Sequence, residues 1–327
     1  ALQLASSLNV TWLRSPNARL TGYPNVTEVI AALPRVAGFL GAFDATWEEG
    51  GKLRAPVRFD LVLDAGPTAQ IGALQPPQGY YRVTDADSLA RSTRELPELV
   101  GEFEKPRFFN YRPNLCAHSR SAKQGCSRCI DVCSTAAIRP DGNTVAVDPH
   151  LCMGCGGCAS VCPSGAMSYQ FPRQTDRGDR LRALLRGFRE AGGSDPRLLV
   201  FAEASSGLLP AQLPADTLPH PVWHVAAIGI DTLLGALALG AGQVVVVCDN
   251  TVAAPYRESL DAAIGLASEL IAGFGLTATH FARVDADSAE SLVTSLAALP
   301  PAHSLPTPAS FAFSNDKRTT VEFALEH

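Results

Sequence analysis

The chain has 327 residues, of which 46% are hydrophobic and 18% charged, and its formal net charge is −5. This length permits two or three domains with sizeable cores, and the composition is that of a globular protein. The acidic balance argues against nucleic acid as the main partner. Eight of the nine cysteines lie between residues 116 and 162, so the chemistry is sought there.

Residues 1–105 are predicted to form a first α/β region. A short apolar run at residues 10–13 indicates a strand. Residues 25–40 read as a helix with Asn25 as its N-cap, and Pro34 is expected to kink or break it.

Residues 57–64 alternate apolar and polar side chains, which predicts a strand with one solvent-facing side. The expected solvent-facing residues are Arg58, Asp60 and Asp64. Residues 85–104 have a helical pattern that Pro97 divides. Tyr80 and Tyr81 are interpreted as packing residues, and no catalytic constellation is recognised in this region.

The clustered cysteines fall into two groups of four. The groups are Cys116, Cys126, Cys129 and Cys133, then Cys152, Cys155, Cys158 and Cys162. The second group has the spacing C-x2-C-x2-C-x3-C and is followed by Pro163. The first has the same ending, but nine residues separate its first two cysteines. Residues 129–138 and 158–167 also repeat one another at each cysteine and apolar position, which predicts a pseudo-symmetric fold.

This segment resembles the bacterial ferredoxins that carry two [4Fe–4S] clusters. The resemblance implies an α+β ferredoxin-like domain over residues 106–172, flanked by α/β domains. It assigns one cluster to Cys116, Cys126, Cys129 and Cys162, and the other to Cys133, Cys152, Cys155 and Cys158. The expected strands are 108–114, 144–147 and 168–171, with a turn at 140–143 and helices at 130–137 and 159–166.

Two departures from the ferredoxin pattern concern the first group. Ser134 replaces a proline, and residues 117–125 form an insert that leaves open whether this cluster has four irons or three. We favour four, because every required cysteine is present. The insert and its flank carry His118, Arg120, Lys123 and Arg128. They form either a positively charged flap over the cluster or a solvated loop, and His118 is not expected to be a ligand.

Zinc and disulfides are the alternatives to clusters. Zinc sites usually set two C-x2-C pairs apart around one ion, whereas three cysteines within seven residues occur twice here. Disulfides suit small secreted scaffolds, so reduced cysteines predict a cytoplasmic location. The apolar residues 222–248 are interrupted by Asp231 and Gln243, which favours a buried strand–helix–strand unit over a membrane span.

Residues 173–196 are predicted to be a helical linker. Its amphipathic part, residues 179–190, presents Arg182, Arg186 and Arg189 at helical spacing. This stripe is either a docking surface or a solvated face.

Residues 197–327 alternate predicted strands and helices, which indicates a doubly wound, mainly parallel sheet. Strands are expected at 198–202, 223–227, 244–248 and 280–284, and helices at 232–239, 255–273 and 288–299. Asp231 is the expected N-cap of the first helix. Sites in such sheets form at the carboxyl ends of strands, where Cys248 is either a buried small residue or a reactive thiol.

Residues 224–248 and 256–284 resemble the delta-subunit domain of methyl-viologen-reducing hydrogenases, which bridges electron carriers to heterodisulfide-reductase-type partners. That family carries an additional small cluster on several cysteines. This region has only Cys248, so the resemblance implies the fold but not the cluster. Residues 319–327 read as an uncapped amphipathic helix, so we expect the chain to be a piece of a longer polypeptide.

The predicted function is electron transfer through two [4Fe–4S] clusters, as a subunit or module linking a redox enzyme to an electron carrier. By resemblance, the partner would be a formate dehydrogenase, a hydrogenase or a heterodisulfide-reductase-like complex. Two alternatives remain. One is an iron–sulfur oxidoreductase with its own substrate or flavin site at the strand ends near residues 248–251. The other is a scaffold whose clusters only hold the fold.

Overall fold

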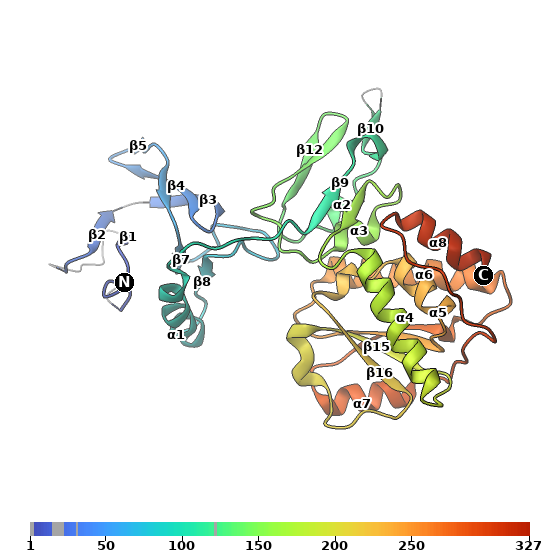
Figure 1. Ribbon diagram of the computed structural model, residues 1–327. Helices are drawn as coiled ribbons and strands as arrows, with labels where there is room; N and C mark the ends of the chain where they lie inside the picture. Colours follow the sequence, from blue (N-terminus) through green and yellow to red (C-terminus); the bar gives the residue numbers. More distant parts are fainter. Residues whose placement is uncertain (1–2, 15–22, 31, 121–122) are drawn as a thin grey trace. The chain divides into compact units, whose positions relative to one another are not determined.

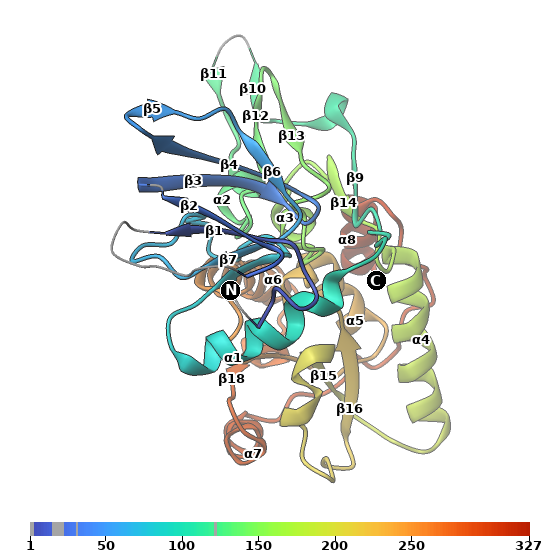
Figure 2. The same ribbon diagram turned by 90° about the vertical axis from the view of Figure 1, so that its left-hand side faces the viewer.

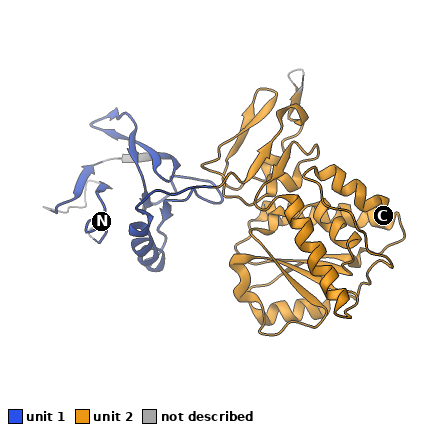
Figure 3. Cartoon of the chain, in the orientation of Figure 1, with its two compact units in different colours: residues 1–105 blue, residues 106–327 orange. Residues whose placement is uncertain are grey.

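The computed structural model describes residues 3–14, 23–30, 32–120 and 123–327 (Figure 1). The chain divides into two compact units, residues 1–105 and residues 106–327 (Figure 3). All nine cysteines belong to the second unit.

The first unit consists mainly of strands. β1 (Val10–Arg14) pairs in parallel with β2 (Val26–Ile30). An antiparallel sheet is centred on β4 (Ala42–Glu49), with partners β3 (Ala32–Phe39), β5 (Lys52–Leu53) and β6 (Val57–Phe59). β7 (Val62–Asp64) pairs in parallel with β8 (Tyr80–Arg82), and α1 (Ala86–Glu95) follows. A 3₁₀ turn over Leu96–Leu99 then contains Pro97, so the helix predicted for residues 85–104 ends earlier than expected.

The helix predicted for residues 25–40 is wrong, because this stretch forms β2 and β3. Asn25 has a φ of 66°, a left-handed conformation rather than that of an N-cap. β2 is rich in β-branched residues, which favour strands. A Cβ at Gly38 would lie 2.1 Å from the carbonyl oxygen of Ala42, so only glycine fits where β3 turns into β4.

The strand predicted for residues 57–64 is split into β6 and β7, and Asp64 lies on the buried side rather than the solvent side. Its carboxylate accepts hydrogen bonds from the Tyr80 hydroxyl and from the N–H groups of Gly66 and Gln70. Burial alone raises the pKa of Asp64, but these hydrogen bonds outweigh it and hold the pKa below its usual value. A charge is tolerated here because it is fully hydrogen-bonded, which residue alternation cannot reveal.

The second unit begins with the cysteine-rich segment. β9 (Phe109–Tyr111) pairs antiparallel with β14 (Met167–Tyr169), and β12 (Ile138–Asp141) forms a hairpin with β13 (Thr144–Val147). The insert forms a small hairpin of β10 (Ser119–Arg120) and β11 (Lys123–Gln124). β9, β13 and β14 therefore lie at or near the predicted strands, although β9 and β14 are shorter. β10, β11 and β12 were not predicted, and the turn expected over residues 140–143 is confined to residues 142–143, because residues 140 and 141 belong to β12.

The two helices of this segment, α2 (Arg128–Asp131) and α3 (Gly157–Val161), begin and end earlier than predicted. Each repeat turns into a left-handed conformation at the same position, with φ of 53° at Ala136 and 68° at Gly165. A right-handed helix cannot continue through such a residue. The predicted pseudo-symmetry is thus visible in the backbone.

The remainder of the second unit is a parallel α/β layer structure. α4 (Gln174–Glu190) precedes a four-stranded parallel sheet of order β16–β15–β17–β18. The strands are β15 (Arg197–Ala202), β16 (Thr217–Val222), β17 (Gln243–Cys248) and β18 (Phe281–Asp285). The helices are α5 (Ile230–Ala238), α6 (Ala254–Ala272), α7 (Ala289–Ala298) and α8 (Lys317–Glu326). The predicted parallel sheet is confirmed.

Both faces of this sheet are buried. Leu198, Val200 and Val244 join a core formed with α4, α5, α6 and α8, while Leu199 and Val245 pack against α7. Figures 1 and 2 show α7 on the opposite side of the sheet from α5 and α6. Strands buried on both faces explain the continuous apolar runs in the sequence.

Two local predictions in this region are wrong. The second strand is β16 rather than residues 223–227, because Pro219 and Pro221 disguise an edge strand, where proline is tolerated. Gly229, not Asp231, is the N-cap of α5. Asp231 is 1% exposed and accepts a hydrogen bond from Gln174 at 2.5 Å. Among the described residues, no helix has the length and apolar character needed to cross a membrane.

Candidate metal centre

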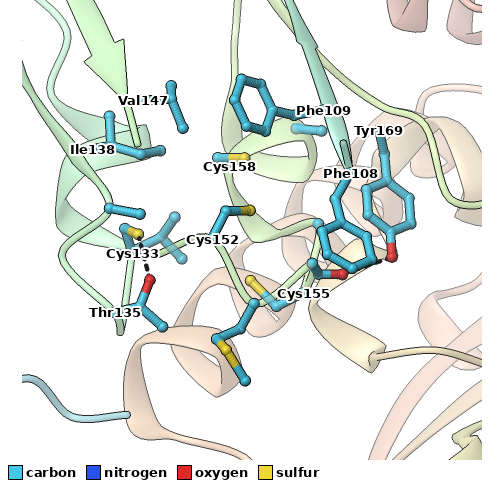
Figure 4. A pocket seen from close by; sticks show the side chains of 16 residues that line it. Phe108, Phe109, Cys133, Thr135, Ile138, Val147, Cys152, Cys155, Cys158 and Tyr169 are labelled. Atoms are coloured by element: carbon cyan, nitrogen blue, oxygen red, sulfur yellow. Dashed lines mark hydrogen bonds between the residues drawn. The ribbon is translucent and has the colours of Figure 1, made fainter. Parts of the chain in front are cut away.

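One pocket in the second unit is lined by four cysteines, Cys133, Cys152, Cys155 and Cys158 (Figure 4). The rest of its wall is mostly apolar and includes Phe108, Phe109, Ile138, Val147 and Tyr169. Cys152 and Cys155 lie in the loop that leads into α3, and Cys158 is the second residue of that helix. Cys133 follows α2 in the other repeat. The structure therefore brings together the four cysteines that the ferredoxin resemblance assigns to one cluster.

The other four cysteines also interact with one another. Burial raises the pKa of Cys129 to about 12, and the thiolate charges of Cys162, Cys116 and Cys126 act in the same direction. Cys158, in the pocket, has its pKa raised by burial and then by the charges of the other three pocket cysteines. Burial and repulsion between thiolate charges thus disfavour the deprotonated form of these cysteines. A metal centre would supply the positive charge that stabilises the thiolates.

The spacing of these side chains suits a cluster better than a single ion. Within the described ranges, no three His, Cys, Asp or Glu side chains lie close enough together to hold one metal ion. Four cysteines around a mostly apolar interior, as in this pocket, are instead the donor set of a [4Fe–4S] cubane. The residues present fit that group.

A hydroxyl group accompanies the last cysteine of each group at an equivalent place. Thr135 Oγ1 lies 3.5 Å from Cys133 Sγ, and Ser164 Oγ lies 3.6 Å from Cys162 Sγ. Burial raises the pKa of Cys162, but hydrogen bonds from the Met167 and Ser164 N–H groups and the Ser164 hydroxyl outweigh it and lower the pKa. Our sequence analysis missed these hydroxyls, although a Ser or Thr two residues after the last cysteine of each repeat is a readable signal.

Two glycines shape the loop that carries Cys152 and Cys155 and leads into α3. Gly154 and Gly156 have φ of 73° and 79°. A Cβ at Gly154 would lie 2.5 Å from the Phe108 ring, and one at Gly156 would lie 2.6 Å from the Ala227 Cβ. The loop is therefore held against both Phe108, just before β9, and the segment that follows β16.

Tyr256, near the start of α6, reaches the pocket from the sheet region. Its hydroxyl hydrogen-bonds the buried Ser134 side chain, 122 residues away in sequence, and also interacts with the Cys155 thiolate. Tyr256 is 1% exposed. Ser134, which stands where ferredoxins have proline, thus connects the cysteine segment to α6 and hydrogen-bonds the hydroxyl group that interacts with Cys155.

Lys317, the first residue of α8, approaches the other set of cysteines. Its ammonium group donates to the carbonyl oxygen of Ser160 and lies 3.4 Å from that of Cys162. Burial lowers the pKa of Lys317, while the negative charges of Asp231 and Cys162 act in the opposite direction. Next to it, Asp316 forms an ion pair with Arg112 at 2.9 Å, which ties α8 to the chain before Cys116. Sequence analysis missed these contacts because they join distant parts of the chain.

The insert is anchored at its base. The His118 side chain is 3% exposed, and its Nδ1 lies 2.9 Å from the carbonyl oxygen of Cys126. The Gly125 and Cys126 N–H groups close the hairpin by donating to the carbonyl oxygens of His118 and Ala117. Residues 121 and 122 lie outside the described residues, and the role of the positive flap stays a prediction.

The remaining predicted features have local partners. On α4, Arg182 pairs with Asp179, Arg186 with Glu190, and Arg189 donates to the Leu239 carbonyl oxygen. Docking on this stripe remains a prediction. Cys248 is fully buried at the end of β17, and burial raises its pKa to about 11, so its thiol is protonated at neutral pH.

Comparisons with known proteins agree with the cysteine geometry. Residues 124–166 match the family model of the 4Fe-4S dicluster domain, which covers seven of the eight clustered cysteines. A ferredoxin-like iron–sulfur domain is therefore present. No solved structure matches the chain.

Three curated relatives, from Staphylococcus aureus strains USA300, COL and MRSA252, are each named "Putative formate dehydrogenase". Each is 31% identical over 101 residues, which covers 27% of this chain. The matched part is only 10% of the length of these relatives.

Proposed function

We propose that this chain transfers electrons through two [4Fe–4S] clusters. The observation that carries the proposal is the arrangement of eight cysteines in two sets of four, each set drawing on both repeats. The match of residues 124–166 to a dicluster domain supports it independently. We assign Cys116, Cys126, Cys129 and Cys162 to one cluster, and Cys133, Cys152, Cys155 and Cys158 to the other.

The chain's own residues would hold and tune these groups. A bound [4Fe–4S] cluster supplies a one-electron redox centre. Phe108, Phe109 and Tyr169 keep water from the four-cysteine pocket. Tyr256 and Thr135 direct hydroxyl groups at its cysteines, and Lys317 places a positive charge near Cys162. Hydrogen bonds and positive charge near cysteine ligands favour the reduced state of a cluster.

The two sets are close enough to influence one another. The negative charge of Cys129, from one set, acts on the thiol of Cys158, from the other. Neighbouring clusters of this kind form a short path for electrons rather than two isolated centres. This favours electron transfer over a scaffold in which clusters only hold the fold.

We propose further that the chain works as a module of a larger redox assembly. The name of the Staphylococcus aureus relatives supports a formate-dehydrogenase-type partner. The hydrogenase and heterodisulfide-reductase-like partners rest on the resemblance of residues 224–248 and 256–284 to the hydrogenase delta-subunit domain. A flavin or substrate site at residues 248–251 has less support, because Arg257 and Ser205 already bond Asp249 there.

The test is iron counting and electron paramagnetic resonance on anaerobically reconstituted protein. We expect about eight irons per chain and two interacting cubane signals after reduction. Cys129→Ser and Cys158→Ser should each remove a different signal and leave about four irons. Cys248→Ser is the matched control and should keep both. One zinc per chain, or no reversible reduction in the wild type, would overturn the proposal.

A further inference from the structure

A second cavity lies at the carboxyl ends of β15 and β16. Its volume is about 340 Å³, and its wall includes Phe171, Arg177, Arg180, Glu203, His220 and Trp223. Glu203 directly follows β15, and Trp223 directly follows β16. The carboxyl ends of parallel strands are where α/β sheets bind ligands, and the volume suits a small molecule.

The cavity wall contains a buried arginine with free donors. Arg177 is 1% exposed, and its Nη1 donates to the Ala227 carbonyl oxygen at 2.8 Å and to Thr232 Oγ1 at 3.3 Å. Its Nε and Nη2 atoms are buried and have no hydrogen-bond partner. A buried donor without an acceptor destabilises the fold. The two unpaired N–H groups of Arg177 therefore indicate that an acceptor from a ligand binds there.

The two free atoms define the shape of that partner. Nε–H and Nη2–H lie along one edge of the guanidinium group and point the same way, which matches the two oxygens of a carboxylate. One face of the group is covered by the Tyr169 ring, whose centre is 5.8 Å from the Arg177 Cζ. The free edge is therefore a bidentate site of fixed orientation.

The charges around the cavity favour an anion with a single charge. Arg177 and Arg180 are positive and Glu203 is negative, while His220 is neutral at pH 7 because burial and the two arginines lower its pKa to about 4. Behind the wall, Asp231 acts on both Arg177 and Lys317. The lining residues thus carry one excess positive charge, which a monocarboxylate neutralises and a phosphate dianion exceeds.

Two aromatic side chains supply an apolar wall. Phe171 is 44% exposed and Trp223 is 48% exposed, and their rings meet edge to face with centres 6.2 Å apart. Phe108, which lines the four-cysteine pocket, stacks on Trp223 with ring centres 6.5 Å apart. Half-exposed rings of this kind bind apolar ligand surface. The Nε and Nη2 atoms of Arg177 are shielded from solvent, so binding at this edge requires the rings to rotate.

We propose that this cavity binds a small organic monocarboxylate. Its carboxylate pairs with the free edge of Arg177, and its apolar body packs against Phe171 and Trp223. The site is separate from the cysteines and does not depend on the proposed electron transfer. Because Phe108 contacts Trp223 and also lines the four-cysteine pocket, a ligand here would lie one aromatic side chain away from the metal centre.

Calorimetric titration of the reconstituted full chain with benzoate tests the proposal. We expect saturable 1:1 binding of benzoate and at least tenfold weaker binding of benzamide, its neutral analogue, since charge-assisted hydrogen bonds are lost. Arg177→Lys keeps the charge but not the parallel donors, and it should weaken benzoate binding by about ten- to a hundredfold. Arg186→Met, an exposed residue of the same helix, is the control and should bind as the wild type does.

A second variant guards against misfolding, because Arg177 also bonds Ala227 and Thr232. Arg180→Met changes an exposed wall residue, removes one of the two positive charges of the cavity, and should weaken benzoate binding while leaving the iron content unchanged. Equal affinity for benzoate and benzamide, or no benzoate binding by the wild type, would refute the site. Tighter binding of inorganic phosphate than of benzoate would refute the monocarboxylate assignment.

Discussion

Gly156→Ala tests how the cysteine loop is held against the sheet region. Gly156 has a φ of 79°, and a Cβ there would lie 2.6 Å from the Cβ and 3.0 Å from the Cα of Ala227. The left-handed conformation costs an alanine about 1–2 kcal/mol, and the overpacking costs about 1–3 kcal/mol. The sum of about 2–5 kcal/mol is a large part of the stability of an ordinary domain.

Gly156 lies between Cys155, in the loop, and Cys158, in α3, so the strain should displace these side chains as well as lower stability. We expect Gly156→Ala to lower the melting temperature by about 10 °C and to lose the cluster of the four-cysteine pocket first. Iron counting, electron paramagnetic resonance and thermal unfolding of the reconstituted protein measure this. Adding Ala227→Gly should restore part of the loss, because it removes the nearest atom but not the backbone strain.

Gly187→Ala is the matched control. Gly187 lies within α4, and a Cβ there would meet nothing within 4 Å, so we expect stabilisation by up to about 1 kcal/mol and full iron content. If Gly156→Ala keeps both clusters and melts like the wild type, the loop does not approach Ala227 as described, and the reasoning fails.

Three further predictions concern potentials and pH. Tyr256→Phe removes a hydrogen bond to Cys155 and should make one midpoint potential more negative by about 20–60 mV. A redox titration followed by electron paramagnetic resonance measures this, and unchanged potentials would contradict the prediction. Lys317→Met removes a positive charge near Cys162 and should lower the midpoint potential of the other cluster by on the order of 50–100 mV. Equal shifts of both midpoint potentials would contradict this prediction. Burial, and then the charges of Arg177 and Arg180, lower the pKa of His220 to about 4. As the pH falls, His220 is therefore protonated in the unfolded chain before it is protonated in the folded chain, and the free energy of unfolding decreases below about pH 6.5. Chemical denaturation should show a loss of about 2 kcal/mol between pH 6.5 and 5 that is absent in His220→Gln.

Features that depend on neighbouring residues could be predicted from the sequence. The cysteine spacing and the internal repeat predicted a segment that holds eight thiols, and the continuous apolar run at residues 244–248 predicted a buried parallel strand, which is β17. The failures have local causes as well. The apolar positions of residues 25–40 fit both the spacing of a helix and the alternation of a strand. The β-branched residues of β2 favour the strand.

Contacts between distant parts of the chain could not be predicted. Ser134 and Tyr256 are 122 residues apart, so no local sequence pattern pairs them. Lys317 reads as an ordinary helix-terminal cation until α8 is placed beside Cys162. Arg177 is similar, because a helical arginine is expected on the surface, and only the packing of α4 on α5 buries it.

The cysteine segment and the sheet region share one hydrophobic core. Val132, next to Cys133, is buried in the same cluster as Leu233 of α5 and Tyr256 of α6, and Cys155 packs against that cluster. A free ferredoxin shields its clusters with its own side chains, whereas here part of the shield belongs to a different fold. We therefore do not expect the cysteine segment to keep its structure when it is separated from the sheet region. Substitutions in the sheet region should therefore alter the surroundings of the clusters. Their reduction potentials should change when residues of the surrounding helices change, even where every cysteine is kept.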